Sequence, residues 1–139
     1  MHEKYKKICE KTHDTKKARE YFEHMLAFTL NPGRLQMMIE DNLDKFTLID
    51  VRDYDDYIKG HIPFAIHVPF EQLEEHLEHF SKDKINIFYG YSLFCQRGEM
   101  ASYILAEEGY PVRNLVGGFK GWKKQDYDVV ETDSEDYRI

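Results

Sequence analysis

Short apolar runs alternate with helix-type segments through most of this chain, and this alternation restricts its fold more than any other feature. The runs are too short for typical helices and are apolar at consecutive positions, as in strands that are covered on both faces of a parallel sheet. Strands that alternate with helices predict βαβ units and therefore an α/β fold. The expected strands lie at 46–51, 65–68, 85–89 and 112–116, and the helices between them at 54–59, 70–80 and 97–108.

The N-terminal segment is predicted to be helical and to lie outside this alternating unit. Asp14 is a suitable cap for a helix that runs to residue 28 and carries apolar residues at helical spacing. Asn31 is a suitable cap for a second helix, and Pro32 suits its first position. We expect residues 1–28 to form a helical extension that packs on the outside of the domain.

Length and composition agree with one soluble domain. The chain has 139 residues and a net charge of −7, which disfavours binding to nucleic acid and to acidic membrane surfaces. The absence of a long apolar run and the charged first residues predict neither a membrane span nor a secretory signal, so a cytoplasmic location is expected. The expected division is a helical extension over 1–28, a domain over 29–130 and an acidic, frayed tail over 131–139.

The loop between the expected strand at 85–89 and the expected helix at 97–108 contains Cys95. A thiol just before a helix start meets unpaired backbone N–H groups and the positive end of the helix dipole, and Arg97 adds a positive charge. All three favour the thiolate, so Cys95 is the candidate catalytic nucleophile. The candidate substrate-binding loop consists of Gly90, Tyr91, Ser92, Leu93, Phe94, Cys95, Gln96 and Arg97.

Two blocks of sequence resemble the signature blocks of rhodanese domains. The first has an apolar strand, Asp-x-Arg, an aromatic residue and Gly-His-Ile-x-x-Ala; the second has a helix that ends at glycine, a strand, and Gly-Gly before a tryptophan. The matching residues are Asp50, Arg52, Tyr57, Gly60, His61, Ile62 and Ala65, followed by Gly109, Gly117, Gly118 and Trp122. Two blocks at matching spacing are far more specific than one short motif. The resemblance implies a three-layer α/β fold in which a five-stranded parallel sheet has helices on both faces.

The resemblance also implies a reaction and a site. In active rhodanese domains the first residue of the loop is a cysteine that accepts sulfane sulfur from thiosulfate or another donor and passes it to cyanide or a thiol. In this chain Gly90 occupies that position, and Cys95 follows five residues later. No cofactor is implied.

Two interpretations of this departure from the family pattern stay open. Either Cys95 transfers sulfur in a shifted geometry, with a small sulfur-containing anion or a protein persulfide as donor or acceptor, or the domain is inactive and binds an anion or a protein partner through the Gly90–Cys95 loop. The sequence does not give the oligomeric state.

Other polar residues of the signature blocks are interpreted as supporting the fold. Asp50 and Arg52 form a charged pair at a strand end, where Arg–carboxylate geometry organises the neighbouring loops. His61 lies in the resembling Gly-His turn and is expected to be architectural. Cys9 is expected to be a surface thiol, and whether it bridges to Cys95 depends on their geometry.

Two further functions are weighed and set aside on spacing. Phosphatases of related topology cradle phosphate with a cysteine, five residues and an arginine, but Ala101 stands six residues past Cys95. His76 and His79 lie three apart on an expected helix, and two ligands without a third nearby indicate a solvated acidic face. No metal site is therefore predicted.

Overall fold

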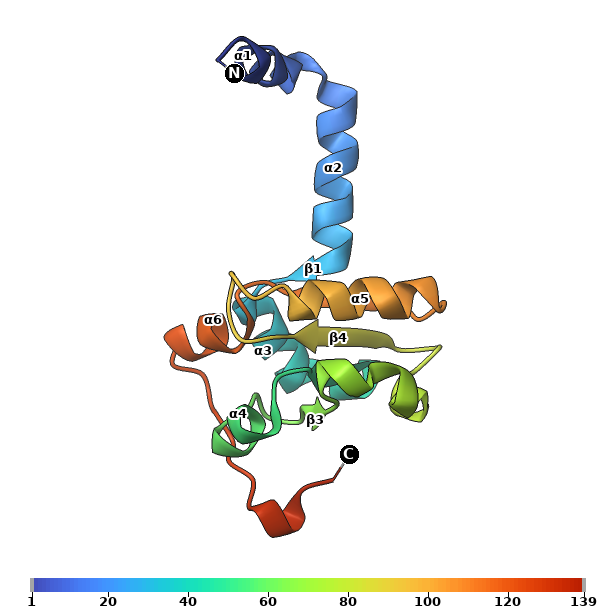
Figure 1. Cartoon of the computed structure of the whole chain (residues 1–139), viewed down its shortest axis with the longest axis vertical. Coiled ribbons are helices and arrows are strands. Elements are labelled where there is room, and N and C mark those ends of the chain that lie inside the picture. Colours follow the sequence, from blue (N-terminus) through green and yellow to red (C-terminus); the bar gives the residue numbers. More distant parts are fainter. Residues whose placement is uncertain (1, 139) are drawn as a thin grey trace.

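The computed structural model of the chain describes residues 2–138 and contains a five-stranded sheet in the order β1-β5-β4-β2-β3. All neighbouring strands are parallel (Figure 1). The strands are β1 (Thr29–Leu30), β2 (Phe46–Asp50), β3 (Ile66–His67), β4 (Ile85–Tyr89) and β5 (Val112–Leu115). The predicted α/β fold with a five-stranded parallel sheet is confirmed.

Helices connect the strands and precede the first one. The α-helices are α1 (His2–Glu10), α2 (Thr15–Phe28), α3 (Pro32–Asp41), α4 (Tyr54–Lys59), α5 (Arg97–Glu107) and α6 (Gly118–Lys124). The 3-10 helices are η1 (Lys11–His13), η2 (Leu43–Lys45), η3 (Phe70–His79) and η4 (Ser134–Asp136). The predicted caps are confirmed: Asp14 accepts a hydrogen bond from the Lys17 amide at 3.1 Å, and Asn31 accepts one from the Arg34 amide at 2.8 Å.

Both faces of the sheet are buried, which explains why its strands are apolar at consecutive positions. Successive residues of a strand point to opposite faces, and the neighbours Leu48 and Ile49 accordingly belong to two different apolar clusters. One cluster packs the sheet against α3 and α6 and contains the fully buried Trp122. The other packs it against α5 and η3 through Leu73, Ala101 and Leu105.

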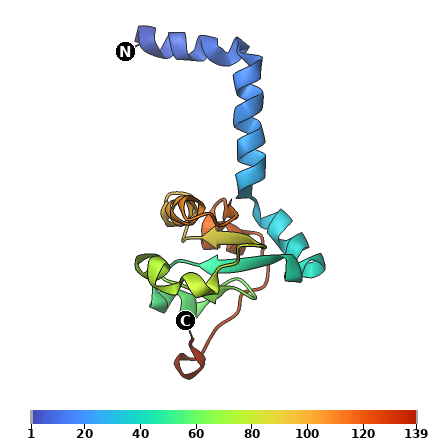
Figure 2. The same ribbon diagram turned by 90° about the vertical axis from the view of Figure 1, so that its right-hand side faces the viewer.

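The N-terminal extension does not pack along the domain as expected. Among the described residues, neither α1 nor α2 buries a side chain, and α2 projects away from the sheet (Figures 1 and 2). The extension is attached at its C-terminal end, where the Arg113 guanidinium donates hydrogen bonds to the backbone oxygens of Leu26 and Thr29. The apolar stripe of α2 is therefore exposed, at 40–71% for Tyr21, Phe22, Met25, Leu26 and Phe28.

Two further segments differ from their sequence-based expectations. Residues 70–79 form a 3-10 helix in place of the continuous helix expected at 70–80, and it is broken at His76, whose φ of −128° and ψ of 37° are not helical. Residues 131–138 of the acidic segment, expected to be frayed, are attached to the domain: Val130, just before them, pairs with His61 through two backbone hydrogen bonds of 2.9 Å, and the half-buried Tyr137 packs beside Tyr57 and His67. Packing of Tyr137 on aromatic side chains attaches this segment, and its run of acidic residues did not predict this packing.

Candidate functional site

The candidate loop lies at the carboxyl end of β4, the central strand of the sheet. The connection after β4 leads to β5 on one side of it, whereas the connection after the neighbouring β2 leads to β3 on the other side. Such a reversal opens a crevice at the carboxyl ends of two parallel strands, and ligands of open α/β sheets bind there. The topology thus places the Gly90–Arg97 loop where a ligand site is expected.

Gly90 and Cys95 come together although they stand at opposite ends of this loop. A Cβ added to Gly90 would lie 3.3 Å from Cys95 Sγ, 3.4 Å from the Gly98 amide nitrogen and 3.6 Å from Arg97 Cβ. Gly90 is buried, and Cys95 is half-buried. The Cys95 sulfur therefore lies beside the space that a side chain at residue 90 would enter.

A tight turn at Ser92 folds the loop back on itself. The Ser92 carbonyl accepts a hydrogen bond from the Cys95 amide at 3.1 Å, and the Ser92 hydroxyl accepts one from the Phe94 amide at 3.3 Å. These two amides serve the turn and are not available to an anion. The first turn of α5, which follows the loop, supplies further amides that have no partners within the helix.

The start of α6 anchors the same loop from its other side. The amides of Phe119 and Lys120 donate to the carbonyl oxygens of Gly90 at 2.9 Å and Tyr91 at 2.8 Å. Gly118 makes this approach sterically accessible: its φ is +58°, and a Cβ there would lie 2.5 Å from the Gly90 oxygen. The Gly-Gly of the second signature block is therefore needed for loop geometry.

The guanidinium of Arg97 is shared with two carboxylates. Its Nη1 lies 3.0 Å from Asp53 Oδ1 and its Nη2 lies 3.6 Å from Glu71 Oε1, across the crevice between the ends of β2 and β4. The hydrogen bond to Asp53 raises the pKa of Arg97, and the charge of Glu71 adds to this effect. The positive charge that the sequence assigns to the thiol's surroundings is thus largely offset by these acids.

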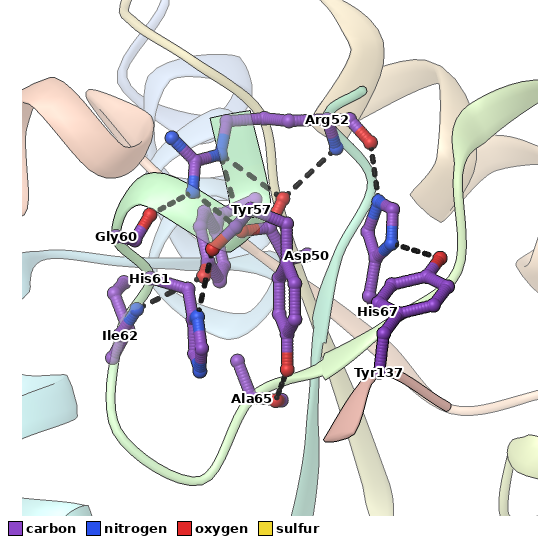
Figure 3. Close-up of polar contacts among 10 residues, drawn as sticks. Asp50, Arg52, Tyr57, Gly60, His61, Ile62, Ala65, His67 and Tyr137 are labelled. Carbon is purple, nitrogen blue, oxygen red and sulfur yellow. Dashed lines mark hydrogen bonds and ion pairs between the residues drawn. The ribbon is translucent and has the colours of Figure 1, made fainter. Parts of the chain in front are cut away.

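Asp50 and Arg52 form a buried ion pair, as Figure 3 shows. Arg52 Nε lies 3.1 Å from both carboxylate oxygens of Asp50, and Nη2 donates to Oδ2 at 2.8 Å and to the Gly60 carbonyl. Burial lowers the pKa of Arg52, but the hydrogen bond to Asp50 and the negative charge of Asp50 raise the pKa by more than burial lowers it, so the net shift is upward. The guanidinium also stacks on Phe119, 4.1 Å from the ring centroid. Among the described residues, none of the hydrogen-bond or ion-pair partners of the Arg52 side chain belongs to the 91–97 segment.

A stack of aromatic rings lies next to this ion pair. His61 packs 3.9 Å and His67 4.6 Å from Tyr57, centroid to centroid, and His61 Nδ1 bonds to the Tyr57 carbonyl at 2.9 Å (Figure 3). His67 bonds to the Arg52 carbonyl through Nε2 at 2.6 Å and to the Tyr137 hydroxyl through Nδ1. Burial lowers the pKa of both histidines. The contacts of His61 are thus those of a residue that supports the fold, as expected. The sequence did not predict the contacts of His67 and Tyr137, because neither residue belongs to a recognisable motif.

The outer surface of the loop is apolar and exposed. The exposed fractions of Tyr91, Leu93 and Phe94 are 50%, 61% and 91%. A groove of about 260 Å³ lies between this surface and α6, and Lys120 and Lys124 lie on its wall. The loop therefore presents apolar side chains next to two cations, which suits contact with a partner that is apolar and anionic.

Cys9 lies on α1 and is exposed, and both cysteines of the chain are free thiols. Within residues 2–138, no helix is long and apolar enough to cross a membrane.

Comparisons with known proteins agree with the observed fold. The chain matches the family profile described as Rhodanese-like domain over residues 31–125. Thiosulfate sulfurtransferase GlpE of Coxiella burnetii is 35% identical over 80 residues, which make up 55% of this chain and 70% of that protein. An HTH-type transcriptional regulator of Mycobacterium tuberculosis is 29% identical over 90 residues, 65% of this chain and 40% of the regulator. The chain therefore spans less than half of that regulator.

A solved structure extends the likeness to the N-terminal extension. The BH2092 protein of Bacillus halodurans is similar with a TM-score of 0.80 and 28% identity, over 85% of this chain and 87% of that chain. Residues 31–139 make up less than 85% of the chain, so the similar region also includes part of the segment before Asn31.

Proposed function

Because the chain belongs to the rhodanese-like domain family, we propose that it transfers sulfane sulfur and that Cys95 is the thiol that carries it. The observation that supports this most is the position of Cys95 Sγ, 3.3 Å from where a Cβ on Gly90 would lie. A side chain at residue 90 would leave the backbone toward the start of α5, and Cys95 reaches the edge of the same space from the far end of the loop. The similarity to a thiosulfate sulfurtransferase supports this chemistry.

The proposed reaction is covalent catalysis in two steps. With thiosulfate as donor, the Cys95 thiolate attacks the outer sulfur, the sulfur–sulfur bond of thiosulfate breaks, and sulfite leaves with the electron pair. A persulfide anion remains on Cys95. An acceptor such as cyanide or a thiolate then attacks the terminal sulfur, and the Cys95 thiolate leaves with the electron pair, so no external oxidant or reductant is consumed.

Backbone dipoles would stabilise the negative sulfur in both steps. The first-turn amides of α5 point toward the loop, and the Gly98 nitrogen is 3.4 Å from the Cβ position of residue 90. Fixed N–H donors at a developing negative charge are effective because they need no reorganisation during the reaction. Arg97 would contribute less than its charge suggests, since Asp53 and Glu71 neutralise it.

Thiocyanate production from thiosulfate and cyanide tests this proposal. The natural protein should produce thiocyanate, and Cys95→Ser should lower the rate at least about a hundredfold, because removal of a covalent nucleophile removes the whole pathway. Cys9→Ser is the matched control and should keep the full rate, since Cys9 is exposed on α1. Equal rates for the natural protein and Cys95→Ser would reject Cys95 as the sulfur carrier.

A second candidate function rests on the exposed apolar surface of the loop. Phe94 is 91% exposed, and two of the loop amides bond to Ser92 instead of facing an anion. These features favour an inactive module that binds an anionic protein partner through the Gly90–Cys95 loop. In that case the natural protein has no transferase activity, and a Gly90→Cys, Cys95→Ser double variant, with its thiol at the family position, gains it.

A further inference from the structure

Three potential metal ligands lie together on η3, away from the candidate loop. They are His76, Glu78 and His79, whose ligand atoms all lie within 4.8 Å of one another. His76 Nδ1 is 3.6 Å and His79 Nε2 is 3.7 Å from the same oxygen, Oε1 of Glu78. The sequence predicted only the two histidines as neighbours, and the third ligand is the new finding.

The break in η3 is what brings the third ligand to the histidines. In a continuous helix, residues three apart share a face, whereas residues two apart do not. His76 and Glu78 are two apart and would therefore point in different directions on a regular helix. The non-helical φ and ψ of His76 redirect the chain at this point, so the Glu78 carboxylate lies between the two imidazoles.

The packing of η3 fixes this arrangement. Leu73 and Phe80 are buried on either side of the cluster, and the half-buried Leu77 packs on the same core. These apolar residues hold both halves of η3 on the sheet face that also carries α5. The ligand side chains stay accessible, with exposed fractions of 24% for His76, 30% for His79 and 67% for Glu78.

The distances suit a small tetrahedral ion. Zinc binds imidazole nitrogen and carboxylate oxygen at about 2.0 to 2.2 Å, and ligands at the corners of such a tetrahedron are about 3.4 Å apart. The two nitrogen–oxygen distances exceed this by only a few tenths of an ångström, which small side-chain rotations remove. Mixed nitrogen and oxygen ligands favour zinc and its transition-metal neighbours over magnesium and calcium, which prefer oxygen.

We propose that His76, Glu78 and His79 bind a divalent transition-metal ion of the zinc class, with a fourth coordination position open to solvent. The acidic residues Glu74 and Glu75 of the same segment favour the approach of a cation. His76 is the residue at the break and Glu78 and His79 follow it, so the bound ion fixes the break relative to the part of η3 that follows. This site is independent of the proposed sulfur transfer.

Titration of the full-length, tag-free and metal-free protein with Zn²⁺ by calorimetry tests this site. We expect one high-affinity ion per chain and at least about tenfold weaker binding for His79→Gln and for Glu78→Gln, since even partners of ligands contribute that much to affinity. Co²⁺ should give the absorption spectrum of a four-coordinate ion, and this spectrum should be lost in the same variants. The controls are His24→Gln and Glu20→Gln, exposed residues of the same types on α2, away from the cluster.

Two results would overturn the site. One is the absence of Zn²⁺ binding to the natural protein, and the other is binding that survives in His79→Gln but is lost in Cys95→Ser, which would assign the ion to the thiol. Circular dichroism checks that each variant is folded. If His79→Gln fails to fold, Glu78→Gln decides the outcome, because that side chain is mostly exposed.

Discussion

A cysteine introduced at residue 90 is expected to form a disulfide with Cys95 inside the loop. In a disulfide, with its sulfur–sulfur bond of about 2.05 Å, the Cβ of one cysteine lies about 3 Å from the sulfur of the other. The Cβ position of residue 90 is 3.3 Å from Cys95 Sγ, so the loop has to move by only a few tenths of an ångström. Gly90 does not have a positive φ, and its backbone therefore accepts a side chain.

The disulfide should make the oxidised variant more stable than the reduced one. It would close a ring of about six residues, for which the chain-entropy relation gives about 2 kcal/mol of stabilisation. Strain from the remaining few tenths of an ångström would reduce this value. The free energy of unfolding of Gly90→Cys, measured by urea denaturation, should therefore rise by up to about 2 kcal/mol on oxidation and fall again on addition of a reductant.

Thiol counting gives the decisive measurement. In a Cys9→Ser background, Gly90→Cys should show two titratable thiols when reduced and none when oxidised, while it stays monomeric on a non-reducing gel. Phe94→Cys in the same background is the matched control, because residue 94 projects into solvent and its thiol should stay free. If oxidised Gly90→Cys keeps both thiols or forms only linked dimers, the Cys95 sulfur does not lie beside residue 90, and the main support for Cys95 as sulfur carrier is lost.

Three further predictions concern stability, each measured as the free energy of unfolding in urea. Arg52→Gln should lower the free energy of unfolding by about 3 to 5 kcal/mol because it leaves the buried Asp50 unpaired. Arg19→Gln breaks an ion pair with Glu23 in which the two side chains are 81% and 60% exposed, and it should cost less than about 0.5 kcal/mol. Similar costs for the two variants would contradict the buried pairing. Burial lowers the pKa of His61 and His67 in the folded protein below 6.5, so the unfolded chain takes up protons at these residues first as the pH falls. The free energy of unfolding should therefore fall as the pH drops through 6.5, by up to about 1.4 kcal/mol per pH unit for each histidine. A His67→Gln variant with the same pH dependence as the natural protein would contradict this. Removal of residues 1–13, which keeps the Asp14 cap of α2, should change stability by less than about 0.5 kcal/mol, since no described residue there is buried, and a larger loss would show that the extension contacts the domain in solution.

The strands and the signature turns could be predicted because their determinants are local in sequence. Consecutive apolar residues specify a strand that is covered on both faces, and β2 and β4 lie within one residue of their expected bounds. Gly109 has the positive φ of +89° that its place after the last periodic residues of a helix predicts. Each of these features is decided by backbone sterics or by burial within a few residues.

The features that the sequence did not predict depend on partners far away along the chain. Arg97 was expected to favour the Cys95 thiolate, and the sequence did not indicate that its guanidinium also bonds to Asp53, 44 residues away along the chain. The apolar stripe of α2 predicts that this face of the helix is buried but does not indicate which residues pack on it. Within residues 2–138, no side chain of α2 is buried. The apolar pattern over 70–80 predicts one continuous helix, whereas the structure has a break at His76. The position of Glu78 beside the two histidines depends on this break.

The chemistry of the loop depends on where a thiol lies in space and not on its place in the alignment. The resemblance to rhodanese domains predicts the sulfur carrier at residue 90, and by that criterion Cys95 is five residues too late. The turn closed by the bond from the Cys95 amide to the Ser92 carbonyl reverses the loop, so that residue 95 returns to the side of residue 90. Both positions then face the first turn of α5, whose amides are the fixed part of the site. Any sulfur transfer by this chain therefore depends on the Ser92 turn, and a Ser92→Gly substitution, which removes the hydroxyl bond to the Phe94 amide and loosens the turn, should lower the transfer rate with the fold intact.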